Sequence, residues 1–183
     1  YIVKISQCMN VDLVEKKITK KTKALLVVHM AGFACDMNEI QKICKKHKLQ
    51  LIEDCAHGLG TFFNRKHVGN FGVSGCFSFY PTKHITTGEG GMIVTNKKDI
   101  YEKCKSLRNL SFSKSYFYRY NHDDIGWNYR MTNMQAALGC GQLKSINKIV
   151  KRKREIGNLY YKYLKKNNKI LFQENKNLSL IQI

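Results

Sequence analysis

The sequence has no apolar run of the roughly 18 residues that a membrane-spanning helix needs. The longest candidate, Ala24 to Ala34, is too short and is interrupted by His29. The N-terminus also lacks a basic segment followed by an apolar stretch and a small-residue cleavage site. We therefore expect a soluble protein with no membrane partner and, by default, a cytoplasmic location.

The sequence also lacks any Cys-x-x-Cys pair. Its seven cysteines are odd in number and scattered, at positions 8, 35, 44, 55, 76, 104 and 140. Zinc sites usually bring cysteines or histidines in closely spaced pairs, and disulfide frameworks usually have an even number of cysteines. The pattern predicts reduced, mostly buried thiols in a reducing compartment and no metal site.

Acidic residues are scarce, with 13 Asp and Glu against 32 Lys and Arg, so the formal charge is +19. A basic surface attracts anions of many kinds. The lysines are spread along the whole chain, however, and only Lys151 to Arg154 forms a dense run. No nucleic-acid-binding motif accompanies them. The abundance of Lys and Asn and the single Pro indicate a compositional bias, and we predict no nucleic-acid partner.

A strand, a helix and a second strand follow one another in the first third of the chain. Ala24 to Val28 is a short apolar run typical of a buried strand. Asp36 and Glu39 have the spacing of a helix start, and the apolar face that follows reaches about His47. Leu49 to Cys55 is typical of another strand. This order favours a right-handed parallel crossover.

Two further short strands are predicted at Gly75 to Tyr80 and Gly91 to Thr95. A helix from about Lys97 to Arg108 should follow, with Asn96 as its cap. The residues expected to face inward on this helix are Ile100, Cys104 and Leu107. Together the alternating strands and helices predict an α/β layered domain.

The last third of the chain is predicted to be mainly helical. Tyr116 to Asp124 has no clear period and is expected to form an aromatic-rich loop. Thr132 and Gln135 have the spacing of a capping box, opening a helical stretch that extends to about Lys165. Leu178 to Ile183 is expected to begin a strand.

Lys83 is the first residue that indicates chemistry. It follows a predicted buried strand, has hydroxyl-bearing neighbours and precedes a glycine-rich turn. Desolvation lowers the pKa of an amine and exposes its lone pair, as a Schiff-base lysine requires. In a lysine-rich chain, however, a lysine in a turn is usually only a solvated charge.

Asp54 is the second residue that indicates chemistry. It lies at the carboxyl end of a predicted strand, where open α/β sheets place their ligands, and a carboxylate there could pair with a pyridinium nitrogen. The alternative is that Asp54 only caps a turn.

Several motifs in this order resemble the DegT/DnrJ/StrS family of sugar aminotransferases, which share the fold of aspartate aminotransferase. The motifs are Val28-His29-Met30-Ala31-Gly32, Glu53-Asp54-Cys55-Ala56-His57, Phe77-Ser78-Phe79-Tyr80-Pro81-Thr82-Lys83, Thr86-Thr87-Gly88-Glu89-Gly90-Gly91 and Asn128-Tyr129-Arg130-Met131. The resemblance extends from about Val11 to about Lys165. It implies a three-layer α/β large domain with a mostly parallel sheet, and pyridoxal 5′-phosphate (PLP) as cofactor.

The resemblance also implies a role for individual residues. Lys83 falls on the lysine that holds PLP as a Schiff base and moves the proton during catalysis. Asp54 falls on the partner of the pyridinium nitrogen, and His57 on a side chain that lies against the cofactor ring. Ser78 falls on a hydroxyl that hydrogen-bonds the cofactor phosphate. Asn128 matches an asparagine that reaches the phosphate of the neighbouring subunit's cofactor, which implies a homodimer. For His57 and Asn128, purely local structural roles stay open.

The implied reaction moves an amino group from an amino acid such as glutamate to a keto group of a nucleotide-linked deoxysugar. Some relatives replace the lysine with histidine and are sugar dehydratases. In this chain Lys83 is present and His84 follows it, which favours transamination.

The resemblance further predicts that the chain is a fragment, incomplete at both ends. Residues 1–165 would be part of the PLP-binding large domain, and residues 166–183 would begin a small C-terminal domain. The 183-residue chain alone is expected to have little or no transaminase activity. Two other functions stay open: a catalytically inactive or regulatory relative, and a basic α/β nucleic-acid-binding module, for which binding would depend steeply on salt.

Overall fold

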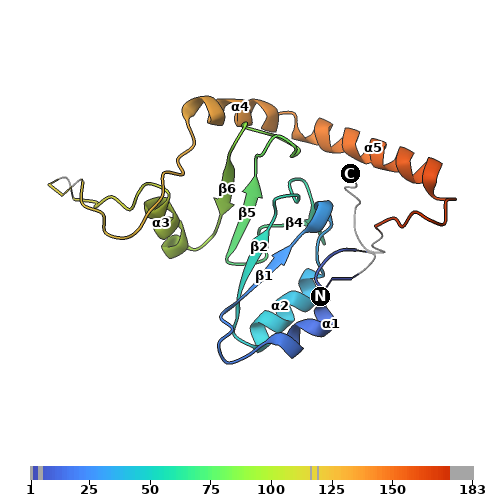
Figure 1. The fold of residues 1–183 in the computed structure, drawn as a ribbon, viewed down its shortest axis with the longest axis horizontal. Helices are drawn as coiled ribbons and strands as arrows, with labels where there is room; N and C mark the ends of the chain where they lie inside the picture. Colours follow the sequence, from blue (N-terminus) through green and yellow to red (C-terminus); the bar gives the residue numbers. More distant parts are fainter. Residues whose placement is uncertain (1, 4–5, 116, 119, 174–183) are drawn as a thin grey trace.

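The fold is α/β, and its central sheet is mostly parallel, as predicted. The computed structural model describes residues 2–3, 6–115, 117–118 and 120–173. Its sheet has the strand order β1 (Ala24–Val28), β2 (Gln50–Asp54), β5 (Ser74–Ser78) and β6 (Gly91–Val94). The first three strands are parallel, and β6 pairs antiparallel with β5. Figure 1 shows this sheet at the centre of the molecule.

The helix α2 (Met37–Lys46) connects β1 to β2, as the sequence predicts. Asp36 is its N-cap, and its carboxylate accepts a hydrogen bond from the backbone N–H of Glu39 at 3.2 Å. One face of α2 is buried in the core. The buried residues of this helix are Met37, Ile40, Ile43 and Cys44. Met37, Ile40 and Cys44 belong with Val27 and Leu51 of the sheet to the main hydrophobic cluster.

The core covers only one face of the sheet. On the other face Leu26 and Ile93 are each about half exposed, at 53% and 51%. Among the described residues, therefore, the second covering layer of a three-layer domain is not present.

Several short elements are not predicted from the sequence. Before β1 lie α1 (Val11–Val14) and the 3₁₀ turn η1 (Glu15–Lys17), and after it lies the 3₁₀ turn η2 (Met30–Gly32). A hairpin forms from β3 (Phe62–Phe63) and β4 (Lys66–His67). Its two turn residues, Asn64 and Arg65, have φ values of 47° and 64°. Positive φ at both central positions is typical of the tight turns that match strand twist.

The helix α3 (Lys98–Leu107) follows β6, but its predicted cap is wrong. The N-cap residue is Lys97, which makes no side-chain capping bond. Asn96 does not cap the helix. The hydroxyl of Thr95 accepts a hydrogen bond from the backbone N–H of Lys97 at 3.0 Å. The same hydroxyl donates to the carbonyl of Val73 at 2.6 Å, which fixes it beside the start of the helix. The three residues expected to face inward are half-buried.

The predicted helical stretch after Thr132 consists of two helices, α4 (Asn133–Leu143) and α5 (Ile146–Leu164), separated at residues 144–145. The Thr132–Gln135 capping box is confirmed. Figure 1 shows α4 and α5 end to end across the top of the molecule, beyond the ends of β5 and β6.

The segment between α3 and α4 extends away from the sheet (Figure 1). The described residues of Tyr116 to Asp124 form turns and one isolated bridge, Phe112 to His122, in agreement with the predicted loop. The strand expected at Leu178 to Ile183 lies outside the described residues. No helix within the described ranges is both long and apolar enough to cross a membrane.

Candidate active site

Asp54 and Ser78 lie at the carboxyl ends of the adjacent parallel strands β2 and β5. Both line one cavity on the open face of the sheet, together with Leu26 and Ile52. An oxygen of Asp54 accepts the backbone N–H of Ala56 at 2.9 Å, so part of its hydrogen-bonding capacity is used locally. This edge is where open α/β sheets bind their ligands.

Lys83 and His57 line a second cavity of about 210 Å³, together with Ala31, Thr82 and His84. The pKa of His57 is lowered by burial and by the positive charge of Lys83, and Asp54 opposes the shift. Both charges therefore act on the same imidazole. The structure brings Asp54, His57 and Lys83 together, with Ser78 beside Asp54.

The tautomer of His57 is defined by its backbone contact. The backbone N–H of Ala31 donates to Nδ1 of His57 at 3.3 Å. A nitrogen that accepts a hydrogen bond carries no proton, so the ring is neutral and its proton lies on Nε2. Ala31 has a φ of 52°, a left-handed conformation uncommon for a residue with a side chain.

The loop that carries Lys83 is tied to α4 by side-chain amides that the sequence does not identify. Gln142 accepts the backbone N–H of Thr86 at 3.1 Å and donates to the carbonyl of the same residue at 2.8 Å. Gln135, predicted only as part of a capping box, also donates to the carbonyl of Glu89 at 3.1 Å. A Cβ at Gly139 would lie 2.9 Å from a methyl carbon of Thr87, so this glycine permits the close approach of α4.

His84 has an unusual environment next to Lys83. Its side chain is buried, and no described residue bonds to its Nε2. Burial lowers the pKa of His84 to about 4, and the positive charges of Lys153 and Lys83 act in the same direction. The imidazole is therefore neutral at physiological pH.

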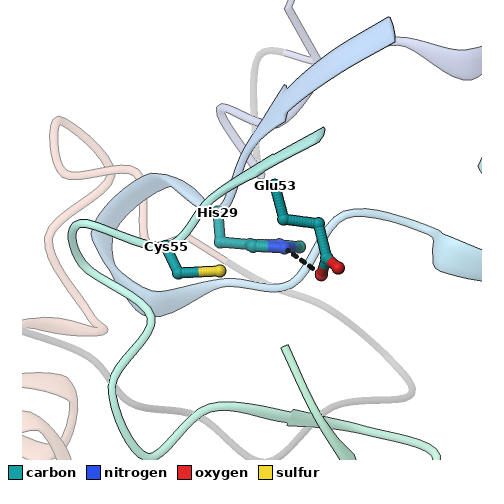
Figure 2. Close-up of side chains that lie close together, drawn as sticks. All are labelled: His29, Glu53 and Cys55. Carbon is teal, nitrogen blue, oxygen red and sulfur yellow. Dashed lines mark hydrogen bonds and ion pairs between the residues drawn. The ribbon is translucent and has the colours of Figure 1, made fainter. Parts of the chain in front are cut away.

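Glu53, adjacent to Asp54, is fully buried and points to the opposite, core side of the sheet. Its carboxylate accepts the backbone N–H groups of Gly69, Phe71 and Gly72, each at 2.7 Å. It also lies 3.2 Å from Nε2 of His29 (Figure 2). Burial raises the pKa of Glu53, but the bonds from His29, Gly69 and Gly72 outweigh it, and the pKa is lowered overall.

The ligand atoms of His29, Glu53 and Cys55 lie within 4.8 Å of one another, a grouping that resembles a metal site (Figure 2). Every oxygen of Glu53 is already hydrogen-bonded. Nδ1 of His29 accepts the backbone N–H of Cys35 at 3.2 Å, which leaves Nε2 as the donor to Glu53. The cluster is therefore a hydrogen-bonded network, and a metal would have to displace most of it.

Asn128 is not brought to the cavities that hold the other predicted site residues. It is exposed and forms an isolated backbone bridge with Asn109, at the end of the segment between α3 and α4. All seven cysteines are unpaired, and four of them are buried, as the sequence predicts.

An open, mostly parallel sheet with an amine, a carboxylate and an imidazole at its carboxyl edge defines the class of α/β proteins that bind ligands at strand ends. The chain matches the model of the DegT/DnrJ/EryC1/StrS aminotransferase family over residues 2–181. The chain belongs to this family.

Several relatives are named as enzymes that act on nucleotide sugars. A GDP-perosamine synthase of Vibrio cholerae is 47% identical over 152 residues, which are 83% of this chain and 41% of that protein. The solved structure of Helicobacter pylori PseC, an aminotransferase of pseudaminic acid biosynthesis, has a TM-score of 0.82 and 37% identity, covering 91% of this chain and 44% of PseC.

A third relative was solved with PLP bound. The structure of an Escherichia coli GDP-4-keto-6-deoxy-D-mannose-3-dehydratase with bound hydrated PLP has a TM-score of 0.82 and 28% identity, covering 89% of this chain and 46% of that one. The chain thus spans less than half the length of these relatives.

Proposed function

We propose that the protein is a PLP-dependent aminotransferase that moves an amino group from an amino acid, such as glutamate, to a keto group of a nucleotide-linked deoxysugar. The observation that carries the proposal is that Lys83 and His57 line one cavity, Asp54 lines another at the carboxyl edge of the sheet, and the charges of Lys83 and Asp54 both act on His57. The names of the relatives, which include a GDP-perosamine synthase and a UDP-amino-sugar transaminase, support the substrate class.

The donor set of the pocket fits PLP. When bound, PLP supplies an aldehyde that takes up the amino group and a ring that withdraws electrons from the reacting carbon. The carboxylate of Asp54 would keep the proton on the pyridine nitrogen. The hydroxyl of Ser78 would donate to the phosphate, and the neutral ring of His57 would lie against the cofactor.

Lys83 would have two roles. Its Nζ would hold the cofactor covalently between turnovers, and would then accept and return a proton once the substrate's amine has displaced it. Its place in the small cavity with His57 and Thr82 would keep the amine close to the reacting carbon. Lysine at this position, in place of the histidine of the dehydratases, supports amino transfer over dehydration.

We also infer a homodimer with active sites at the subunit interface. The segment before α4 and the start of this helix expose large apolar side chains, and contiguous exposed patches of this kind are typical of protein contacts. The side chains of Ile125, Tyr129 and Met134 are 79%, 73% and 82% exposed. Asn128 lies within this surface, where it could extend to the cofactor of the second subunit.

Residues 1–165 are proposed to belong to the PLP-binding large domain and residues 166–183 to the small domain. Seven unpaired thiols support a cytoplasmic location. The dense basic run of α5 offers little support for nucleic-acid binding. Lys153 and Arg154 are half-buried, with Lys153 near His84 and Arg154 lining a cavity beside the β3–β4 hairpin.

Borohydride reduction in the presence of PLP tests the proposal. We expect the cofactor to be trapped on the peptide that contains Lys83, in the longest form of the protein that its gene encodes. Lys83→Arg should abolish trapping and lower amino transfer to keto-sugars by at least about 10²–10⁴-fold, the contribution of a positioned acid–base group.

Lys98→Arg is the matched control, because Lys98 is an exposed residue at the start of α3. It should leave both trapping and amino transfer unchanged. Trapping on other lysines, or undiminished trapping in Lys83→Arg, would contradict the assignment. Trapping on Lys83 without amino transfer to any keto-sugar would favour the inactive or regulatory relative.

A further inference from the structure

Buried residues behind the pocket are connected to His57 through the loop 29–35, which hydrogen bonds hold at both its ends and its middle. Glu53 is anchored by three backbone N–H groups of residues 69–72. His29 links Glu53 to the backbone of Cys35 through its two ring nitrogens. Figure 2 shows the imidazole of His29 with its edge toward the carboxylate and Cys55 beside it.

The bond between Nδ1 of His29 and the backbone N–H of Cys35 closes the short loop 29–35, and the bond to Glu53 fixes the imidazole that makes it. His29 and Cys35 are the first and last residues of this loop, and both are fully buried or nearly so, at 0% and 1% exposure. The backbone N–H of His29 is bound to the carbonyl of Asp54 at 3.0 Å, so the start of the loop is fixed to the end of β2. The loop therefore has a defined position relative to the carboxylate of Asp54.

Ala31 lies in the middle of this loop and faces the pocket. Its positive φ is a strained conformation for a residue with a Cβ. A strained conformation persists only where the surroundings enforce it. Closure of the loop by His29 provides that constraint, and as a result the N–H of Ala31 points at Nδ1 of His57.

We propose that Glu53 and His29 are positioning residues for the cofactor pocket: they close the loop 29–35 so that Ala31 holds His57 as the Nε2–H tautomer. The ring of His57 then presents its N–H away from Ala31 and stays neutral against a bound cofactor. This inference rests on the proposed function for its catalytic meaning, while the tautomer itself is a property of the protein without cofactor.

NMR of selectively ¹⁵N-histidine-labelled protein without PLP tests the proposal directly. The ring nitrogens of His57 are assigned by their loss in His57→Asn. We expect Nδ1 to be unprotonated and Nε2 protonated, and the amide of Ala31 to exchange slowly with solvent. A wild-type His57 with its proton on Nδ1 would overturn the proposal without any variant.

His29→Gln removes the hydrogen bond that closes the loop 29–35. The glutamine amide can still donate to Glu53, which preserves the buried carboxylate, but nothing then accepts the N–H of Cys35. We expect a folded protein in which His57 becomes a mixture of both tautomers and the amide of Ala31 exchanges faster. PLP should bind about three- to tenfold more weakly, the effect of losing one neutral hydrogen bond.

His47→Gln is the matched control, because His47 also pairs with a glutamate, Glu15 at 2.7 Å, but lies on the surface away from the pocket. It should leave the ¹⁵N signals of His57 unchanged. A folded His29→Gln variant with an unaltered His57 tautomer would overturn the proposal that His29 positions His57. This outcome is distinguishable from failure of the proposed function, which would appear as absent PLP trapping on Lys83 in the wild type.

Discussion

Two parts of the molecule differ in how they are held in place. The core region, residues 24–87, contains three parallel strands and α2, and its Val27, Met37 and Ile40 are completely buried. The helical region, residues 98–164, has no fully buried residue in α3 or α4, and in α5 only Val150 and Gly157 are buried. The core region therefore has its own hydrophobic core. The helical region exposes surface that is suited to further contacts.

The regions meet at the Lys83 loop. Gln142 binds the backbone of Thr86, and Lys153 acts electrostatically on His84. Residues of both regions therefore set the environment of the predicted catalytic amine, although one region is tightly packed and the other is not.

The largest expected effect comes from truncating the same side chain in each region. Met37 is 0% exposed and Met134 is 82% exposed. Met37→Ala should lower the free energy of unfolding by about 2–5 kcal/mol, because it removes buried methylenes and leaves a cavity. Met134→Ala should change it by less than about 0.5 kcal/mol in the monomer. Urea denaturation of both variants measures the difference.

If Met37→Ala and Met134→Ala lowered the free energy of unfolding equally, the two regions would not differ in packing as described. A cost for Met134→Ala that grows with protein concentration would instead strengthen the difference, since a dimer interface over α4 stabilises the folded state by mass action.

A smaller effect is expected from the buried imidazole between the regions. The pKa of His84 is about 4 in the folded protein, against an ordinary value of 6.5. Because the folded pKa is the lower one, the unfolded chain binds the proton more tightly, and stability is lost as the pH falls from about 6.5 toward 4. The loss attributable to His84 should be on the order of 3 kcal/mol.

His84→Leu tests this pH dependence. It removes the titrating group and the nitrogen without a partner, so stability at pH 7.5 should be unchanged or higher. Stability should also fall less steeply below pH 6.5. Denaturation midpoints measured at several pH values give both quantities, and identical pH profiles for the two proteins would contradict the shifted pKa.

The sequence predicts the core region better than the helical region because the former is periodic. Ala24–Val28 is found as predicted, and the apolar face of α2 follows the expected spacing. The hairpin around Asn64 and Arg65 is missed because its strands have two residues each and its turn lacks the usual glycine. The prediction of Asn96 as the cap of α3 is wrong because the helix begins one residue later, after Lys97, whose N–H is bound by the hydroxyl of Thr95.

For the candidate site, the sequence indicates the candidate residues but not the contacts that support them. Lys83, Asp54 and His57 are predicted from ordered motifs, and the structure brings them together. The roles of Glu53 and Gln142 depend on backbone groups that are distant in sequence. Glu53 is bound by residues 69–72, and Gln142 lies 56 positions from Thr86. A single sequence contains no local pattern for such contacts.

The smallest expected effect tests the link between the two regions. Gln142→Ala leaves both the N–H and the carbonyl of Thr86 without a protein partner, at a half-buried position. The expected cost is about 1–2 kcal/mol, below the upper end for fully buried groups because water can partly replace the amide. Gln41→Ala, which removes a single exposed bond to the carbonyl of Phe71, is the control and should cost less than about 0.5 kcal/mol.

Hydrogen exchange at the amide of Thr86 gives the local measurement. If α4 holds the Lys83 loop, exchange should accelerate there in Gln142→Ala and stay unchanged in Gln41→Ala, while the amides of β1 and β2 are unaffected in both. Unaltered exchange at Thr86 would mean that the core region orders this loop alone. The bonds of the loop to Phe79, from the backbone of Thr87 and the hydroxyl of Thr86, would then be sufficient, and the helical region would be attached to the site without shaping it.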